Sequence, residues 1–163
     1  MLALTPTATV PTPTPTASAT LPTATDTPTA TTGSPTATNT PGTCASISVG
    51  TLTVNTATNT VTLPLTNTTG GAEIISTIIA EWIDNPADQR INALQRDGTP
   101  LLYANWSTPP VTINLGSLPA SDRSILPTTT VNLEFVFGTT IVELNGYKFT
   151  IFFQSNCQVE GSN

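Results

Sequence analysis

The most restrictive feature of this sequence is a run of threonine, proline and alanine from Leu4 to Thr43. Eight of the chain's 15 prolines lie in this run, and Asp26 is its single charged residue. Proline removes an amide donor and fixes φ, so this composition forms neither a helix nor the interior of a sheet. We therefore expect residues 1–43 to form an extended stalk, biased toward polyproline II, that builds no hydrophobic core of its own.

Threonine hydroxyls beside proline make the stalk a candidate for O-linked glycosylation, as in other stalks rich in these residues. We favour this interpretation over a bare disordered linker. The candidate acceptors are Thr12, Thr14, Thr16, Thr23, Thr27, Thr29 and Thr36. The N-x-Ser/Thr triplets at Asn67 and Asn105 are candidates for N-linked glycans. Because threonine-rich chains contain such triplets by chance, we favour the interpretation that both asparagines are unmodified.

Few residues carry charge, and the sequence contains no histidine. Ten acidic residues give a net charge of -6 against four basic residues, Arg90, Arg96, Arg123 and Lys148. Nucleic-acid binding needs a basic face, so this balance excludes a nucleic-acid partner. The lack of histidine removes the commonest general base and metal ligand, together with Ser-His and Cys-His nucleophile pairs. We therefore expect a chain that is not an enzyme and needs no cofactor.

The two cysteines, Cys44 and Cys157, bracket the part of the chain that follows the stalk. Their spacing is far from the C-x-x-C pattern of redox and zinc sites, so we predict a disulfide, which forms in oxidising compartments. Two unrelated buried thiols are the alternative. No stretch reaches the roughly 18 apolar residues of a membrane span. We expect an extracellular or cell-surface protein, although Met1–Leu4 lacks the basic and apolar runs of a signal peptide.

From Cys44 onward, apolar and polar residues alternate between turn residues, which is the pattern of half-buried β-strands. The predicted strands cover residues 47–54, 60–66, 73–83, 101–103, 111–115, 131–137 and 147–153. For residues 84–98 the pattern is compatible with either a short strand or one helical turn. These elements predict an all-β fold, an antiparallel sandwich over residues 44–163 that follows the extended stalk.

Glycine and proline mark where these strands bend or end. We expect Gly50 to form a bulge and Pro64 to lie at an edge or a bulge, because proline cannot donate to a ladder. Asp97-Gly98 signals a turn, and Asn145-Gly146 favours a type I′ hairpin turn before the last strand. Residues 73–83 carry apolar side chains at both parities, so we expect both faces of that strand to be partly covered.

Several segments together resemble a known kind of module. They are C-A-S-I-S-V-G-T-L-T-V from Cys44, N-T-V-T-L-P-L-T-N-T-T-G from Asn59, a strand that ends in Trp82, L-Y-A-N-W-S-T-P-P from Leu102, and Y-K-F-T-I-F-F-Q-S-N-C up to Cys157. Over residues 44–157 this order resembles immunoglobulin-like modules on Thr/Pro-rich stalks in secreted and surface proteins of bacteria. The resemblance implies an immunoglobulin-like β-sandwich and an extracellular location. Its motifs concern packing and the disulfide, and they imply no catalytic residues.

Aromatic residues suggest one binding site. Flat, amphipathic rings bind the faces of sugars, and Trp106, in a predicted loop, forms a candidate sugar platform with Tyr103. Trp82 ends an apolar strand, so we expect it in the core. For Trp106 too we favour packing over sugar binding.

Acidic residues suggest a weaker site. Asp84, Asp88 and Asp97 carry the oxygen ligands that Ca²⁺ prefers. Their spacing is not that of a Ca²⁺ loop, and Arg90 and Arg96 lie among them. We therefore favour a solvated loop and predict no metal site.

The leading functional hypothesis is a structural subunit of an extracellular filament or surface coat that self-associates. The sandwich is then a globular bead, and the stalk links subunits. Donation of Leu2–Val10 as a strand to a neighbour's sheet is a related hypothesis that the proline density disfavours. The alternative is a stalk-displayed carbohydrate-binding or adhesion module, and a secreted hydrolase fragment is the least favoured hypothesis.

Overall fold

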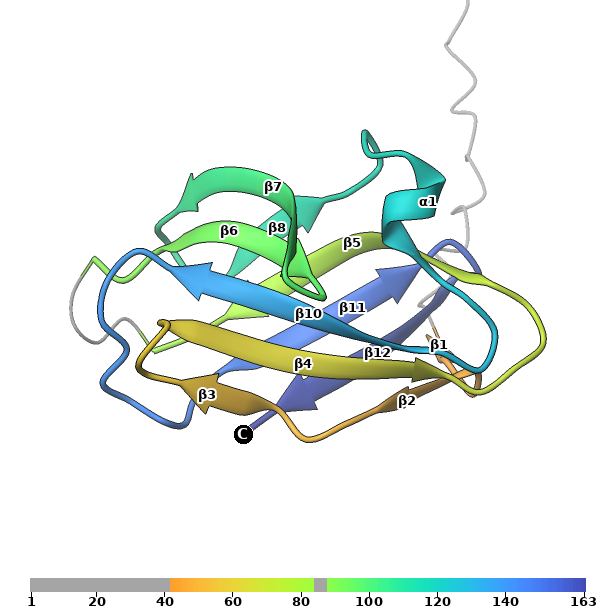
Figure 1. The fold of residues 1–163 in the computed structure, drawn as a ribbon, viewed down its shortest axis with the longest axis horizontal. Helices are drawn as coiled ribbons and strands as arrows, with labels where there is room; N and C mark the ends of the chain where they lie inside the picture. Colours follow the sequence, from red (N-terminus) through yellow and green to blue (C-terminus); the bar gives the residue numbers. More distant parts are fainter. Residues whose placement is uncertain (1–41, 84–87) are drawn as a thin grey trace, which may run out of the picture. The chain divides into compact units, whose positions relative to one another are not determined.

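The computed structural model describes residues 42–83 and 88–163, which fold into two packed β-sheets (Figure 1). The seven stalk threonines, Leu2–Val10 and Asp84 lie outside the described residues. Strand β1 (Gly42–Thr43) is the first described element and lies directly before Cys44. The predicted all-β sandwich is confirmed.

The first sheet has the strand order β1–β12–β11–β5–β8, and β9 also pairs with β5. The bounds of the other strands are β5 Glu73–Glu81, β8 Val111–Asn114, β9 Ser124–Ile125, β11 Lys148–Phe153 and β12 Cys157–Ser162. The pairing of β1 with β12 is parallel, and the other described pairs are antiparallel. Strands β1 and β8 are therefore the two edges of this sheet.

The second sheet has the strand order β2–β4–β10–β6–β7, and β3 pairs with β4 beside β2. Its bounds are β2 Ile47–Val49, β3 Thr53–Asn55, β4 Thr60–Asn67, β6 Ile91–Arg96, β7 Thr99–Trp106 and β10 Thr130–Phe137. The open segment 84–98 thus contains a strand, and the short strand predicted at 101–103 is much longer. A single turn of helix, α1 (Ala120–Arg123), precedes β9. No helix of the described residues is long and apolar enough to cross a membrane.

Alternating side chains of β4 and β10 fill the space between the sheets. Every second residue is buried, as the period-two pattern predicts: Val61, Leu63 and Leu65 on β4, and Val131, Leu133, Phe135 and Phe137 on β10. Phe135 stacks on Phe149 of the first sheet with ring centroids 3.7 Å apart. Burial of each such large side chain contributes about 1.5–3 kcal/mol. This interlocked core positions the edges and loops discussed below.

Pro64 lies on a central strand, so the predicted edge position is wrong, but the alternative of a bulge agrees with the register, which gains one residue opposite Pro64. It pairs with Asn132 on one side, and on the other side it faces the break between β2 and β3. The amide of Gly50 donates to the Pro64 carbonyl at 2.9 Å in that break. Residues 50–52 lie opposite only residues 63–64, so the chain at Gly50 contains one extra residue, as in the predicted β-bulge. A Cβ on Gly50 would lie 2.9 Å from the Pro64 Cβ. The interrupted neighbour strand is therefore what accommodates the missing amide proton of the proline.

One predicted turn is confirmed and one is wrong. Asp97 and Gly98 join β6 to β7 with φ values of 49° and 75°, as a type I′ hairpin requires. Asn145-Gly146 forms no hairpin, because β10 and β11 belong to different sheets and the connection crosses from one sheet to the other. Gly146 has a φ of 90° and its amide donates to the Asn163 carbonyl, so it holds the end of β12 instead.

Strand β5 changes the face that it buries part-way along. Ile75 is buried, and then Ile78, Ala80 and the following Trp82 are buried at the opposite parity. A register shift opposite Phe152 and Phe153 inserts the extra residue, as in a β-bulge. The apolar residues at both odd and even positions of β5 are therefore explained by the bulge as well as by partial burial of the two faces.

Candidate functional site

The disulfide predicted from the sequence joins the entrance of the sandwich to its last strand. Cys44 and Cys157 are bonded, with Cα atoms 5.0 Å apart and a sequence separation of 113 residues. The parallel pairing of β1 with β12 surrounds the bond, since Gly42 lies opposite Cys157 and Thr43 opposite Gln158. The Cys44 amide donates to the Gln158 carbonyl at 3.0 Å. We call this region, residues 42–46 and 155–158, the clasp.

A carboxylate on β5 connects the two sides of the clasp. Glu73 accepts hydrogen bonds from the Ser46 hydroxyl at 2.9 Å and from the Ser155 hydroxyl at 2.7 Å. The Ser155 Oγ also lies 3.2 Å from the Cys157 Sγ. Hydrogen bonds to an ionised group are worth more than neutral ones. No local sequence pattern marks Glu73, because its two partners lie 27 and 82 residues away in the sequence.

An open hollow of about 340 Å³ lies beside the clasp. Its lining residues are Ser76, Thr77, Ile79, Phe152, Phe153, Asn156 and Cys157. Cys44 is buried with 4% of its surface exposed, whereas Cys157 is half-buried. Cys157 is therefore the more exposed of the two bonded cysteines.

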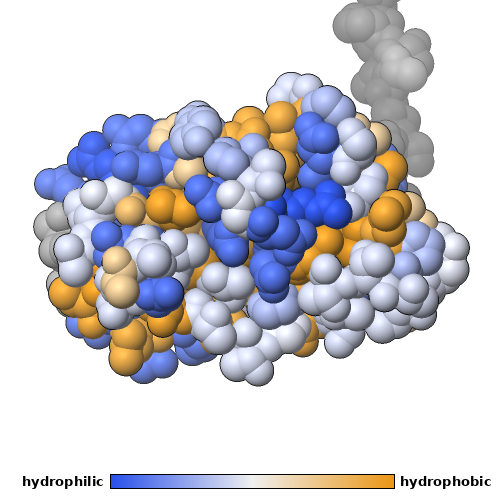
Figure 2. All heavy atoms as spheres, viewed as in Figure 1, coloured by the Kyte–Doolittle hydropathy of each residue, from blue (hydrophilic) through white to orange (hydrophobic). Residues whose placement is uncertain are grey.

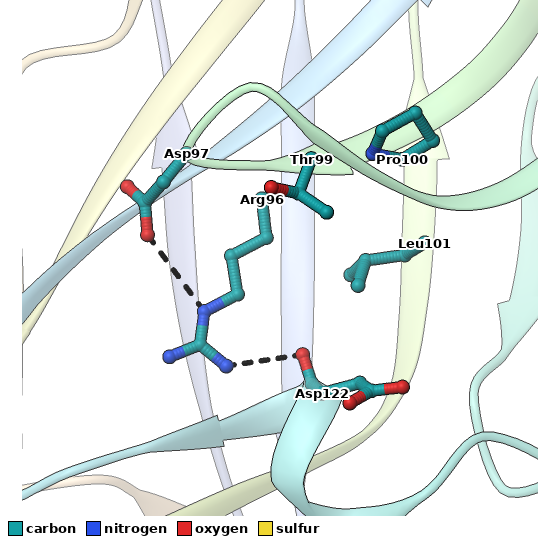
Figure 3. A pocket seen from close by; sticks show the side chains of 6 residues that line it. All are labelled: Arg96, Asp97, Thr99, Pro100, Leu101 and Asp122. Carbon is teal, nitrogen blue, oxygen red and sulfur yellow. Dashed lines mark hydrogen bonds and ion pairs between the residues drawn. The ribbon is translucent and has the colours of Figure 1, made fainter.

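A second open hollow, of about 330 Å³, lies between the β6–β7 hairpin and α1 (Figure 3). One Nη of Arg96 donates to the Ser121 carbonyl at 3.3 Å and to the Asp122 carbonyl at 3.0 Å. Its Nε lies 3.8 Å from an Asp97 carboxylate oxygen. The guanidinium thus fastens the hairpin to the helix, which is a structural use of the only cation in this hollow's lining.

Of the three acidic residues named as weak Ca²⁺ candidates, Asp88 and Asp97 are described and Asp84 is not. One carboxylate oxygen of Asp97 accepts from the Asn132 amide at 2.8 Å, so it fastens the hairpin turn to β10. Over residues 42–83 and 88–163 the structure contains no group of three His, Cys, Asp or Glu side chains that is placed to hold a metal ion.

The aromatic candidates occupy very different environments. Trp82 is buried, packs edge-to-face on Phe137 and donates its ring N–H to the Gln89 carbonyl at 3.3 Å. Trp106 lies at the end of β7, not in a loop, and packs against the core while remaining half-buried. Tyr103, on the same strand, is 76% exposed. Of the two residues of the candidate sugar platform, Tyr103 is therefore the more exposed.

The two sequons also differ. Asn67 is completely buried, and its amide nitrogen donates to the carbonyls of Gly71 at 2.7 Å and Ile125 at 2.9 Å. Glycosylation at Asn67 would break both hydrogen bonds, so the side chain of Asn67 is not accessible for modification in the folded domain. Asn105 is exposed on β7, and its side chain is accessible.

Strand β7 forms an uncharged edge of the second sheet. It is the terminal strand of the order β2–β4–β10–β6–β7, and no Asp, Glu, Lys or Arg occurs from Gly98 to Ser121. Figure 2 shows a surface of mixed polarity, on which apolar residues form separate spots among polar ones. We call residues 99–106 the open edge, because nothing in the described residues pairs with its outer side.

Two groups near the end of β12 have shifted pKa values. Burial raises the pKa of Tyr147, and the negative charge of Glu143 adds to this effect, while a hydrogen bond with Gln89 opposes it. A hydrogen bond with Glu160 raises the pKa of Lys148, with further contributions from the charge of Glu160 and from Glu81. Lys148 lies 3.2 Å from Glu160 on β12 and 3.4 Å from Glu81 on β5, so it bridges both neighbours of β11.

No protein-family model, curated protein or solved structure matches this chain. The functional interpretation therefore rests on the clasp, the two hollows and the open edge described above.

Proposed function

We propose that this chain is a structural subunit of an extracellular filament or surface coat, in which the sandwich is the bead and residues 1–43 link it to its neighbours. The observation that carries the proposal is the clasp. The stalk enters the domain where a disulfide, a parallel strand pair and the Glu73 bridge act on the same few residues. A linking element transmits a load to its bead only when its attachment resists peeling. The clasp supplies that resistance.

The strand order supports an immunoglobulin-like assignment for the bead. Strands β2–β4–β10–β6 follow the order A-B-E-D, and β12–β11–β5 follow the order G-F-C. The Tyr147 hydroxyl donates to the Glu143 carbonyl at 3.2 Å just before β11, which resembles the tyrosine corner at the start of strand F. The disulfide differs, because in antibody domains it joins strands B and F. Here it fastens the stalk side of the domain to strand β12.

The open edge supports self-association. Natural sheets protect an edge strand with charges, prolines or bulges. The open edge has register shifts against β6 and Pro100 near its start, but it has no charge and it exposes Tyr103. At a net charge of -6, two copies repel each other least where charges are absent. We propose that the open edges of two copies meet.

A concentration series of the full chain tests this proposal by negative-stain imaging and analytical ultracentrifugation. We expect oligomers or filaments of the wild-type protein, and an association at least tenfold weaker for Tyr103→Lys. Val142→Lys is the matched control, since Val142 is 57% exposed on another part of the surface and receives the same charge. Monomers at every concentration, or equal loss in both variants, would contradict the proposal.

The extracellular location is tested on native material. The disulfide and the threonine-rich stalk support export and O-glycosylation. Intact-mass spectrometry of protein recovered from its natural source should show glycan mass on residues 1–43 and the loss of two hydrogens at the cysteines. Free thiols together with an unmodified stalk would contradict this part of the proposal.

A stalk-displayed carbohydrate-binding module is the second candidate, and the exposed ring of Tyr103 is the observation that favours it. Stacking on a sugar needs the ring and not the hydroxyl. A glycan array should then show binding that Tyr103→Ala abolishes and Tyr103→Phe retains. The absence of any bound glycan would remove this candidate and would leave the structural proposal unaffected.

A further inference from the structure

We infer that the Cys44–Cys157 bond diverts mechanical force around the sandwich. When the stalk and the residues after β12 are pulled apart, the folded chain between the two cysteines carries no tension. A pull on the stalk reaches the domain at Gly42–Thr43 and then Cys44. From the Cys44 Sγ the covalent path continues through the Cys157 Sγ into β12. The part of the chain between the two cysteines, which separates them by 113 residues, forms a closed side loop. Tension therefore runs outside most of the sandwich.

Strand β12 is suited to carry this tension. Residues Cys157–Ser162 are already extended, so a pull along them releases little length. The strand pairs antiparallel with β11 over five residue pairs, from Phe152–Gln158 to Lys148–Ser162. At its far end the Asn163 amide donates to the Tyr147 carbonyl, and the Tyr147 amide donates to the Asn163 side chain at 3.1 Å. Strand β12 is thus attached to the sandwich at both of its ends, but the rest of the sandwich does not carry the tension.

Reduction of the disulfide changes the path completely. The load then passes from Thr43 into Cys44 and β2, which pairs with β4 over only three residues. Strand β1 pairs with β12 over two residues, so neither contact replaces a covalent bond. Every residue between the cysteines becomes part of the stretched chain. The same bead is thus almost inextensible when oxidised and extensible when reduced.

A dithiol reaches this switch through the hollow beside Cys157. Its thiolate attacks the Cys157 Sγ, and the Cys44 Sγ leaves as a thiolate that takes up a proton. The second thiolate of the reagent then displaces the Cys157 Sγ, which is protonated in turn, and the reagent becomes a cyclic disulfide. The protein disulfide is reduced by two electrons, and the dithiol is oxidised by two.

Single-molecule stretching of the full chain, with a handle at each end, tests this inference. Held at constant force, the oxidised protein should show no lengthening above about 20 Å, the extended length of β12. Addition of dithiothreitol should lengthen each tether once, by about 400 Å of contour length. The double variant Cys44→Ala with Cys157→Ala should release that length without reductant and gain none from it.

The contour length between the two cysteines does not depend on whether the reduced domain refolds. A variant that fails to fold therefore still gives a usable length measurement. A release of about 400 Å from the oxidised protein, or no gain on reduction, would overturn the inference. The measurement uses isolated molecules and is independent of self-association, so its failure is distinguishable from failure of the proposed function.

Discussion

The two sheets treat their outer strands in opposite ways. In the first sheet, β1 pairs with the outer side of β12, and the disulfide and the Glu73 bridge fasten the chain at the start of that strand. In the second sheet, no described strand pairs with the outer side of β7, and residues 99–106 carry no charge. An uncovered edge is a template for pairing with another chain. The comparison contrasts β12, which is fastened within the chain, with β7, the edge strand on which the proposed self-association rests.

Loss of the disulfide should have the largest effect on stability. We expect the double variant Cys44→Ala with Cys157→Ala to lower the free energy of unfolding by up to about 4.7 kcal/mol, because a loop of this size then closes without a covalent bond. Urea denaturation of the oxidised wild-type protein and the variant measures the difference. An unchanged midpoint would mean that the clasp adds nothing that the strand pairs do not already provide.

The carboxylate bridge should have the next largest effect, and a carboxylate of the second sheet that accepts a single hydrogen bond offers a matched control. Glu73→Ala removes the acceptor of two serine hydroxyls and should cost about 1–2 kcal/mol. Glu134→Ala removes a carboxylate that accepts from the Gly98 amide at 2.9 Å in the exposed β6–β7 turn. We expect a cost below about 0.5 kcal/mol for that variant. Equal costs in denaturation experiments would mean that the Glu73 bridge contributes no more than a single exposed hydrogen bond.

Alkaline pH should weaken the far end of the clasped strand β12. The pKa of Tyr147 is raised in the folded state, so its contribution is complete below the ordinary pKa of 10.0 and is lost as the pH rises through the folded value. Stability should therefore fall above about pH 10. Tyr147→Phe should make this fall in stability shallower. Part of the fall should remain, because the pKa of Lys148 is also raised in the folded state. A wild-type slope in the variant, measured by denaturation at several pH values, would contradict the assignment.

Substitution in the open edge should have the smallest effect on stability. Tyr103 is exposed, so Tyr103→Lys should change the free energy of unfolding by less than about 0.5 kcal/mol. The same variant is expected to lose association, as described above. A large loss of stability, seen as a shifted urea midpoint, would show that this strand belongs to the core and not to an available edge.

Local patterns predicted the strands well. The alternation at 60–66 and 131–137 placed the buried residues of β4 and β10 correctly, because side-chain direction in a strand has a period of two residues. Asp97-Gly98 specified its turn through the positive φ of both residues. The disulfide followed from the presence of only two cysteines. Each of these properties is encoded within a few residues or by elimination.

Other features were decided by contacts between distant parts of the chain. Asn145-Gly146 carries a hairpin signal, yet β10 and β11 join different sheets because their partners are β4 and β6 in one case and β5 and β12 in the other. Asn67 begins an N-x-Ser/Thr triplet, and only the fold shows that its side chain is buried and donates to the Gly71 and Ile125 carbonyls. Glu73 gained its role only when folding brought Ser46 and Ser155 together.

By itself, the sequence determined that residues 44–163 form a disulfide-closed all-β domain, because periodicity and cysteine count are local or additive properties. The tertiary structure alone decided which edge is clasped and which is open. Strand pairing and register depend on contacts far apart in the sequence, and a strand's own residues carry no record of which neighbour they will meet. That choice of neighbours gives the molecule its load path at the clasp and its uncovered face at β7.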